Sequence, residues 1–423
     1  MFKNRDIVCS VEIGTSKICV LVGEISGDGQ VEVVGRGLVP SGGAVVKGEI
    51  CNYPALLPLL EKAVDEADAS SGGCLGACRL VHVLVTGCGI SSQPGVGSAT
   101  IRNEERIVTE SERREAMENA QVLNLAGDRE ILNCSETFFK VDGRRVSNPL
   151  QQRGVRLETH VHVVHGIAAR LDVFRRAVAD AGFGDVNTEV TFSVLADDFA
   201  VLTDDEREQG VLLIDLGAGC TEYVVEYDRG ICASGVIQLG MEHVANDLSV
   251  AMNLNIDLCR RMLADGTLGK MRAENREFLE FRGSAGHIRK IPLTSFETVI
   301  DWRLREIFEI VKAQLAESGA PHSLDAGGVL TGGGASFFRS EELFREVFDL
   351  DCRKRIPADV GGVLTGLDDP RFTSVWGGLK LAAHFLGEYD ETRKPFDSLV
   401  DGLNRWWGSS KSTLKNIKKV IRI

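Results

Sequence analysis

The sequence predicts an α/β protein built from two similar halves around a nucleotide cleft, each half with a small inserted lobe. The first observation is residues 210–227, GVLLIDLGAGCTEYVVEY: an apolar strand, an acid, a glycine-rich turn and a second strand. Residues 8–25, VCSVEIGTSKICVLVGEI, repeat this form. The duplication continues further along the chain, where LVTGCG at 84–89 matches VLTGGG at 329–334. Repeats on this scale imply two halves that each have a core.

The tips of the two hairpins carry the chemistry. One acid stands at the end of each first strand, Glu12 and Asp215, and small or glycine residues follow it. Turn amides form a concave site for an anion, and a carboxylate beside them can hold a cation. A single Asp-x-Gly-x-Gly hairpin is a common turn. Because the motif occurs twice, we expect the tips to grip the phosphates of a Mg²⁺–nucleotide from both sides.

Composition excludes several classes of protein. The chain has 423 residues, 43% of them hydrophobic, and a net charge of −13, so the body is not expected to bind nucleic acid. No apolar run approaches the ~18 residues of a membrane-spanning helix. The N-terminus enters a strand without a signal-peptide stretch, and eleven Cys favour reduced, intracellular thiols. Cys74 and Cys78 form the only close cysteine pair, and no second pair stands at zinc spacing.

Hydrophobic periodicity gives the order of elements. In the first half we expect a hairpin at 7–22, strands at 30–38 and 80–85, helices at 54–69 and 168–181, a strand at 185–190 and a linking helix at 194–202. In the second half we expect the hairpin from 210, a strand at 236–239, and helices at 241–252, 341–348 and 372–386. Gly377 and Gly378 indicate a close approach of the last helix to its neighbour.

Once these motifs are placed, the sequence resembles the actin/sugar-kinase/DnaK superfamily and, within it, the FtsA family of bacterial cell-division proteins. Four runs carry the resemblance: VEIGTSK at 11–17, NPL followed by GVRLETHVHVV at 148–164, VLTDDEREQGVLLIDLGAG at 201–219, and VLTGGGASF at 329–337. The resemblance implies an actin-like ATPase fold with two RNase H-like halves.

The resemblance also implies a division into subdomains. In the family's terms these are 1A (1–89 and 165–203), 1C (90–164), 2A (204–254 and 326–387), 2B (255–325), a linker (388–411) and an amphipathic membrane-targeting helix (412–423).

Carried over residue by residue, the resemblance implies the nucleotide-binding residues. The first phosphate loop would be Glu12, Gly14, Thr15, Ser16 and Lys17, and the second Asp215, Gly217, Ala218, Gly219 and Cys220. Gly332, Gly333, Gly334 and Ala335 would lie against the adenosine, and Asp215 would hold Mg²⁺ through water. Cys220 replaces a common threonine and Glu12 an aspartate of actin, while the adenine-side residues of the second lobe are not evident.

The resemblance implies an ATP-binding, self-polymerising adaptor on the cytoplasmic side of the inner membrane at the division septum. It would tether the ring of the tubulin-like protein FtsZ, through the FtsZ C-terminal peptide, and recruit other divisome proteins. We expect weak or no ATPase activity, because no water-orienting Gln occurs at 191–195. The alternatives are an ATP-dependent phosphotransferase of the same superfamily and an adaptor similar to the pilus-assembly protein PilM.

A phosphotransferase needs a general base near the acceptor hydroxyl. Asp197 and Asp198 in the linking helix are the candidates. Paired carboxylates are common on protein surfaces, so we expect them to form a solvated helix turn.

The C-terminal residues carry the membrane prediction. Leu414, Ile417, Val420 and Ile421 share one face of a helix, Lys415, Lys418 and Lys419 occupy much of the rest, and Trp406 and Trp407 suit the headgroup level. From residue 402 onward there are six basic residues and no acidic one. This pattern predicts a helix lying flat on anionic lipid.

Overall fold

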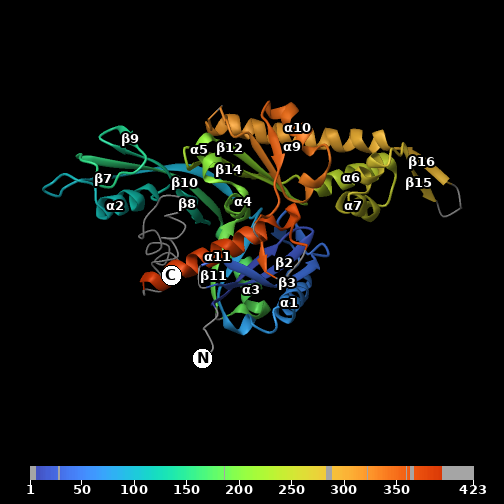
Figure 1. Cartoon of the computed structure of the whole chain (residues 1–423), viewed down its shortest axis with the longest axis horizontal. Helices are drawn as coiled ribbons and strands as arrows, with labels where there is room; N and C mark the ends of the chain where they lie inside the picture. The colour runs from blue at the N-terminus through green and yellow to red at the C-terminus, as the bar shows by residue number, and fades with distance from the viewer. Residues whose placement is uncertain are drawn as a thin grey trace.

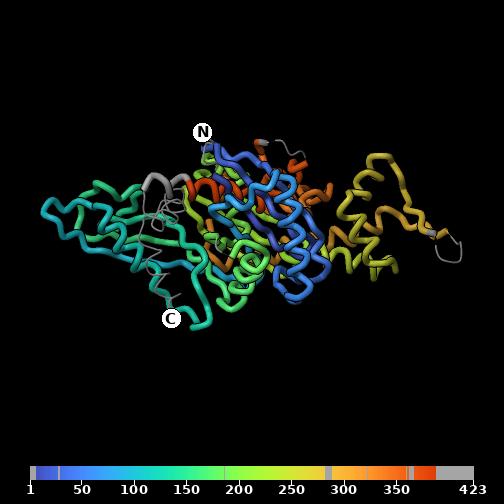
Figure 2. The backbone as a smooth tube through the Cα atoms, turned by 90° about the horizontal axis from the view of Figure 1, so that it is seen from below, coloured from blue at the N-terminus to red at the C-terminus, as the bar shows by residue number. Residues whose placement is uncertain are grey.

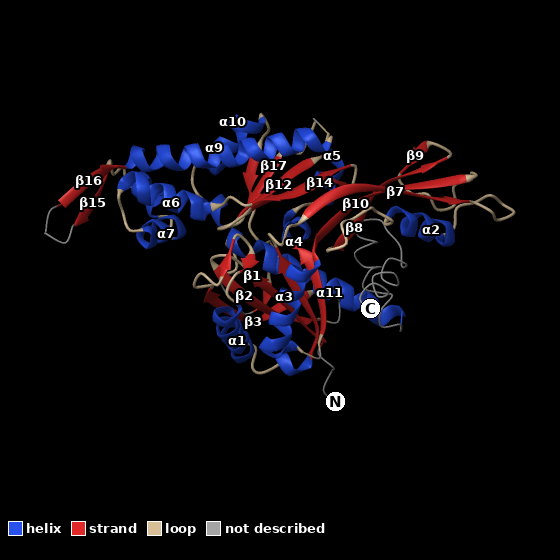
Figure 3. Ribbon diagram, turned by 180° about the vertical axis from the view of Figure 1, so that it is seen from behind, coloured by secondary structure: helices blue, strands red, loops and turns tan. Residues whose placement is uncertain are grey.

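The computed structural model describes residues 6–26, 29–184, 186–282, 288–321, 323–358, 360–362 and 366–392. Figure 1 shows an elongated molecule with two sheets stacked at its centre and a small lobe at each end, and Figures 2 and 3 show the same arrangement from below and from behind. The predicted tail, including the helix at 412–423, lies outside the described residues.

The two central sheets repeat one strand order, which is the duplication seen in the sequence. The first reads β11-β6-β1-β2-β3-β19 and the second β18-β17-β12-β13-β14. In each sheet the hairpin pairs antiparallel, while the strand on its other side runs parallel to the first hairpin strand. Bounds in the first sheet are β1 (Asp6–Ile13), β2 (Lys17–Ile25), β3 (Val31–Pro40), β6 (Cys78–Val85), β11 (Asn187–Phe192) and β19 (Gly361–Gly362). In the second they are β12 (Val211–Leu216), β13 (Thr221–Tyr227), β14 (Gly230–Ile237), β17 (Gly328–Thr331) and β18 (Cys352–Lys354).

Helices cover both faces of the first sheet. α1 (Tyr53–Ser70) packs on β2 and β3, and α11 (Thr373–Thr392) packs on the opposite face against β1, β2 and β6. The central strands are therefore buried on both faces, which explains their nearly continuous apolar sequences. α3 (Ala168–Val178) and a π-helical turn, η2 (Ala179–Phe183), follow the inserted lobe, and β4 (Val45–Val46) and β5 (Glu49–Ile50) form a small hairpin. The described residues also contain three short 3₁₀ turns: η1 (Leu75–Ala77), η3 (Gly333–Ser336) and η4 (Pro370–Phe372).

α4 (Ser193–Val201) and α5 (Asp204–Gln209) join the halves. The second half has its own core, into which α6 (Met241–Met252), α9 (Leu293–Ser318) and α10 (Ser340–Phe348) pack. Its lobe consists of α7 (Ile256–Ala264), α8 (Thr267–Ala273) and the hairpin of β15 (Phe278–Arg282) and β16 (Ile288–Pro292).

The lobe inserted in the first half is a sheet of order β7-β10-β8-β9 with α2 on one face. Its elements are β7 (Ser91–Thr100), α2 (Glu110–Ala120), β8 (Arg129–Val141), β9 (Arg144–Val146) and β10 (Arg156–Ile167). It also touches the second half, because Ser92 Oγ donates to the Ser234 carbonyl at 2.6 Å and Thr137 Oγ1 to the Ile231 carbonyl at 3.1 Å. The lobe therefore bridges from the first half to β14.

Some predicted boundaries were wrong. α11 runs to Thr392, so the linker predicted from residue 388 begins inside a helix. The strand predicted at 236–239 is β14, which begins at Gly230 and ends at Ile237 because β13 pairs with it along its whole length. None of the helices in the described part of the chain is both long and apolar enough to cross a membrane.

The close approach predicted at Gly377 and Gly378 is confirmed. A Cβ at Gly377 would overlap the backbone carbonyl of Ala196 on α4, and one at Gly378 would lie 3.1 Å from the side chain of Leu84. α11 therefore crosses α4 and β6 at backbone distance, and only glycine allows it.

We expect Gly377→Ala to lower the free energy of unfolding by about 2 kcal/mol, because overlap with a backbone carbonyl exceeds the gain in helix propensity. Gly76→Ala is the matched control, since nothing lies within 4 Å of the added methyl, and it should change stability by less than about 0.5 kcal/mol. Urea unfolding followed by circular dichroism measures both. Equal stability of the two variants would show that α11 does not cross α4 this closely.

Candidate functional site

The first hairpin tip is a rigid turn between β1 and β2. The Gly14 amide donates to the Lys17 carbonyl at 2.9 Å, and Ser41 Oγ donates to the Gly14 carbonyl at 2.6 Å. Lys17 forms an ion pair with Glu12. Burial lowers the pKa of Lys17, but the Glu12 carboxylate outweighs that effect and raises it above its usual value. The tip thus holds a fixed cation–carboxylate pair beside its turn amides.

The second tip lies between β12 and β13 and is anchored by α6. The carbonyls of Gly217 and Ala218 accept from the amides of Met241 at 3.0 Å and Glu242 at 2.8 Å. Cys220 is buried, which raises the pKa of its thiol to about 12 and makes it an inert neutral group.

The two tips meet across the junction of the halves. A Cβ at Gly219 would overlap the Thr15 side chain and lie 2.9 Å from the Cα of Lys47. The Thr15 hydroxyl in turn accepts from the Gly48 amide at 3.0 Å. Thr15 and Gly219, which are 204 positions apart in the chain, therefore form one surface, as the repeated hairpins predict.

Lys47 is a candidate that the sequence analysis did not identify. It stands at the tip of the β4–β5 hairpin with a positive φ of 51°, unusual for a residue with a side chain. Its positive charge acts on two groups of the second half. Burial raises the pKa of Cys220 and the Lys47 charge opposes that effect, whereas burial and the Lys47 charge both lower the pKa of His243. The sequence indicates this position only by a Lys-Gly pair between two short β-prone runs, a pattern that is typical of an ordinary turn.

The Thr-Gly-Gly-Gly end of β17 packs against the end of β12, next to the second tip. Gly332 has a φ of 79°, and a Cβ there would overlap the Asp215 carboxylate. A Cβ at Gly334 would lie 2.7 Å from the Leu216 side chain, and Ala335 is buried. At Gly333 an added Cβ would meet only the Arg371 side chain, at 3.4 Å. Gly332 and Gly334 are therefore needed for packing, whereas Gly333 is the glycine whose added side chain the protein can accommodate.

Three acids gather where these elements meet. Asp197 on α4, Asp215 on β12 and Glu222 on β13 each offer an oxygen, and these atoms lie within 4.8 Å of one another. Burial, followed by the Glu12 carboxylate, raises the pKa of Asp215 to about 6. Burial and neighbouring carboxylates also raise the pKa values of Asp197 and Glu222 well above their ordinary range. The junction thus concentrates negative charge that is poorly solvated.

The prediction that Asp197 and Asp198 form a solvated helix turn was wrong. Both are fully buried, because α4 lies between α11 and the second sheet. Asp198 accepts from Arg207 Nε at 3.3 Å, which compensates its charge. Asp197 belongs to the acid cluster, and sequence alone could not identify it because its partners lie 18 and 25 residues away.

The lobe of the second half presents fewer free cations than its sequence suggests. Arg260 pairs with Glu242 and Asp257, Arg272 with Glu297, Arg276 with Glu274, and Lys290 with Glu280. Arg261 and Lys270 remain exposed there. On α9 of the same half, 76% of Trp302 is exposed. Large exposed aromatic side chains often mark sites of protein association.

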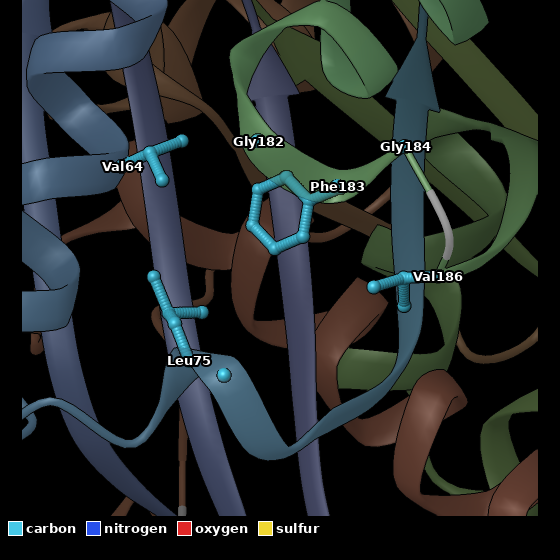
Figure 4. A pocket seen from close by; sticks show the side chains of 7 residues that line it. Val64, Leu75, Gly182, Phe183, Gly184 and Val186 are labelled. Atoms are coloured by element: carbon cyan, nitrogen blue, oxygen red, sulfur yellow. The ribbon is translucent and has the colours of Figure 1, made fainter.

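A separate pocket of about 250 Å³ lies on the first half between α1, η1 and η2 (Figure 4). Its lining is apolar side chains and glycines: Val64, Leu75, Gly76, Gly182, Phe183, Gly184 and Val186. None of the predicted nucleotide-binding residues contributes to it.

Comparison with family models finds two matches. Residues 87–165 match the SHS2 domain inserted in FtsA, and residues 212–377 match the model of the cell division protein FtsA. The first match corresponds to the lobe of β7 to β10, and the second contains the second hairpin tip and the glycines after β17.

Relatives match over nearly the whole chain. The sequence is 31% identical to the cell division protein FtsA of Borreliella burgdorferi, covering 92% of this chain and 94% of the relative. It is 28% identical to FtsA of Neisseria meningitidis, covering 96% and 99%.

Solved structures share the fold. The PilM–PilN type IV pilus biogenesis complex matches with a TM-score of 0.58 at 16% identity, covering 89% of this chain and 98% of that one. MreB5 of Spiroplasma citri bound to ADP matches with a TM-score of 0.54 at 14% identity, covering 92% and 100%. The two halves therefore have an actin-like arrangement.

Proposed function

We propose, from the premise that this chain belongs to the FtsA family of cell-division proteins, that it is an ATP-binding adaptor which polymerises and links FtsZ to the cytoplasmic face of the membrane. The observation that carries the nucleotide site is the contact of the two hairpin tips, with Gly219 against Thr15. A small ligand with several anionic groups, such as a chain of phosphates, could be held by both turns at once.

The phosphates would lie between Gly14–Lys17 and Gly217–Cys220, and the adenosine against Gly332–Ala335. Lys47 would add a second cation, after Lys17, from the β4–β5 tip, since its backbone already lies against Gly219. The unpartnered oxygens Asp215 Oδ1 and Glu12 Oε2 fit a nearby cation such as Mg²⁺. When bound, Mg²⁺ would neutralise charge on the phosphates, and the residues of the chain would orient it.

Weak hydrolysis remains our expectation. Asp197 is a buried carboxylate near the site, as a general base for a phosphotransferase would be. Asp197 lies beside two other carboxylates and is fully buried, so no acceptor substrate can reach it directly. Membership of the FtsA family also favours an adaptor over a phosphotransferase. The likeness to PilM is one of fold at 16% identity.

Two surfaces would serve partners. The lobe of β7 to β10 contains no catalytic cluster among its described residues and would contribute to contacts between copies, as the resemblance implies. The lobe of α7, α8, β15 and β16, together with α9, would receive the C-terminal peptide of FtsZ, with apolar contact at Trp302 and cations at Arg261 and Lys270. Other divisome proteins and anionic lipid, bound by the tail from 402 onward, complete the proposed partners.

We expect Gly333→Val to weaken ATP binding at least tenfold, because its side chain would occupy the adenosine contact while the fold accommodates it. Gly127→Val, where nothing lies within 4 Å of the added Cβ, is the control and should bind as the wild type does. Isothermal titration with ATP and Mg²⁺ measures the affinity. Unchanged affinity in a folded Gly333→Val protein would exclude this site.

We expect reversal of two free cations, Arg261→Glu with Lys270→Glu, to weaken binding of the FtsZ tail peptide, since that peptide bears acidic groups. Lys62→Glu on α1 carries the same kind of change on the first half and should leave binding intact. Fluorescence anisotropy of a labelled peptide separates them. Equal loss in both proteins would point to a general charge effect and against this lobe as the docking surface.

We expect a chain truncated after Glu391, and the variant Ile417→Glu, to lose binding to anionic vesicles. Each basic residue near the surface contributes about 1 kcal/mol, and the apolar face supplies the insertion. Ile417→Leu keeps that face and should pellet with vesicles as the wild type does. Pelleting with and without ATP, followed by electron microscopy for filaments, measures anchoring and polymerisation together. Full binding by the truncated chain would refute anchoring by this segment.

A further inference from the structure

Two cysteine side chains meet at the start of the first sheet. Cys78 Sγ donates a hydrogen bond to Cys9 Sγ across 3.4 Å, although the two residues are 69 positions apart in the chain. Cys9 lies on β1, and Cys78 is the first residue of β6. In the sequence Cys78 is close to Cys74, only four positions away, but the fold gives it Cys9 as its thiol partner.

The strand register brings the two side chains together. β1 and β6 are parallel neighbours, and Ile7 lies opposite Cys78. Cys9 is two residues further along β1 than Ile7, so the side chains of Cys9 and Cys78 point to the same face of the sheet. The contact between the two sulfur atoms is therefore set by the sheet itself and does not depend on a loop.

The two thiols differ in their access to solvent. Cys9 is 0% exposed, and burial, followed by the hydrogen bond with Cys78, raises its pKa well above the ordinary value. Cys78 is partly exposed. Oxidants attack accessible cysteines first, because the sulfur must be reached by the reagent. Cys78 is therefore placed to react first, while Cys9 is held beside it as a second thiol.

The chain that leads to Cys78 lies at the surface. Gly76 and Ala77 of η1 are exposed. Leu75 and Gly76 also line the pocket of about 250 Å³ between α1, η1 and η2 (Figure 4). Only short side chains stand directly before Cys78 in the sequence, so a small oxidant can approach this strand end without opening the sheet.

We propose that Cys78 and Cys9 form a site of reversible oxidation, at which a hydroperoxide converts the two thiols into an intramolecular disulfide. The site lies in the first half, away from the hairpin tips, and the proposal goes beyond the nucleotide and adaptor function proposed above. Disulfides of proteins in reducing compartments are usually transient and often report on oxidants.

The reaction has two steps. The Cys78 thiolate attacks one oxygen of the hydroperoxide, so that an S–O bond forms, the O–O bond breaks and an alcohol, or water from hydrogen peroxide, leaves. Cys9 Sγ then attacks the sulfur of the Cys78 sulfenic acid. The S–S bond forms as the S–O bond breaks, and the hydroxide that leaves takes up the Cys9 proton as water. Two thiols are oxidised and one hydroperoxide is reduced.

The geometry favours this pair over the other cysteines. A disulfide bond is about 2.05 Å long, so the two sulfur atoms need to approach by about 1.4 Å. Four other thiols are buried and have pKa values raised to about 12 by burial, which makes them unreactive: Cys19, Cys88, Cys220 and Cys352. The bond would join β1 to β6 and close the chain between residues 9 and 78.

The test uses the full chain, reduced with dithiothreitol, desalted and treated with hydrogen peroxide. Remaining thiols are blocked with N-ethylmaleimide, and peptides are mapped by mass spectrometry without reduction. We expect a peptide containing Cys9 to be joined to one containing Cys78, with two free thiols lost per chain and both recovered with dithiothreitol. Because the bond restricts the unfolded chain, the oxidised protein should also unfold at a higher temperature than the reduced protein.

Variants separate the roles of the two thiols. In Cys9→Ser the second step is impossible, so Cys78 should stop as a sulfenic acid that dimedone traps. Cys78→Ser should leave Cys9 as a free thiol and show no difference in unfolding temperature after peroxide. Cys74→Ser and Cys51→Ser are the matched controls, because they remove the neighbour in sequence and an exposed thiol, and both should form the bond as the wild type does.

Two results would overturn the proposal: a bond between Cys74 and Cys78 in the wild type, or peroxide treatment that leaves Cys9 and Cys78 both free. If Cys9→Ser does not fold, the wild-type peptide map and Cys74→Ser decide. Gly333→Val should lose ATP binding and keep the disulfide, so the outcome at the cysteines is independent of the nucleotide site.

Discussion

The structure depends on the direct contact between Gly219 of the second half and Thr15 of the first. No side chain larger than hydrogen fits at Gly219, because a Cβ would overlap the threonine and press on the Lys47 backbone. The two sheets are thereby held with their hairpin tips facing each other. The acids at the ends of β1 and β12, Glu12 and Asp215, thereby become neighbours.

This contact places acidic groups where water is scarce, and the molecule compensates them unequally. Glu12 has Lys17, and Asp198 has Arg207, so each of these carboxylates is neutralised by a fixed cation. Asp197 has no cation of its own among the described residues and instead lies near two further acids. A folded chain normally pairs or hydrogen-bonds its buried charges. Burial, followed by the Asp215 and Glu222 carboxylates, raises the pKa of Asp197 well above its ordinary value, which favours the neutral acid at this meeting point of the halves.

Much of the architecture could be predicted from the sequence, because the same motifs occur in the same order in both halves. The acid-x-Gly tips and the Thr-Gly-x-Gly strand ends predicted two halves of the same design, and the two central sheets share one strand order. The sequence could not predict burial that depends on which elements lie on top of one another. Asp197 and Asp198 look like a polar helix turn until α11 and β13 enclose α4. Lys47 likewise gains meaning only when its small hairpin reaches Gly219, and the paired cations of the second lobe appear free until Glu242 and Glu297 are placed beside them.

The inserted lobe of β7 to β10 contacts both halves of the molecule. It belongs to the first half by sequence, yet it bonds to β14 of the second half: His162 Nε2 lies 2.7 Å from Ser234 Oγ, and Arg145 pairs with Asp228 at 2.6 Å. Burial lowers the pKa of His162 to about 4, so the imidazole is neutral near pH 7 and can share a hydrogen bond with the serine. Any rotation that separates the halves must break these contacts or carry the lobe along with β14. The lobe, at one end of the molecule, is therefore mechanically tied to the second half as well as to the first.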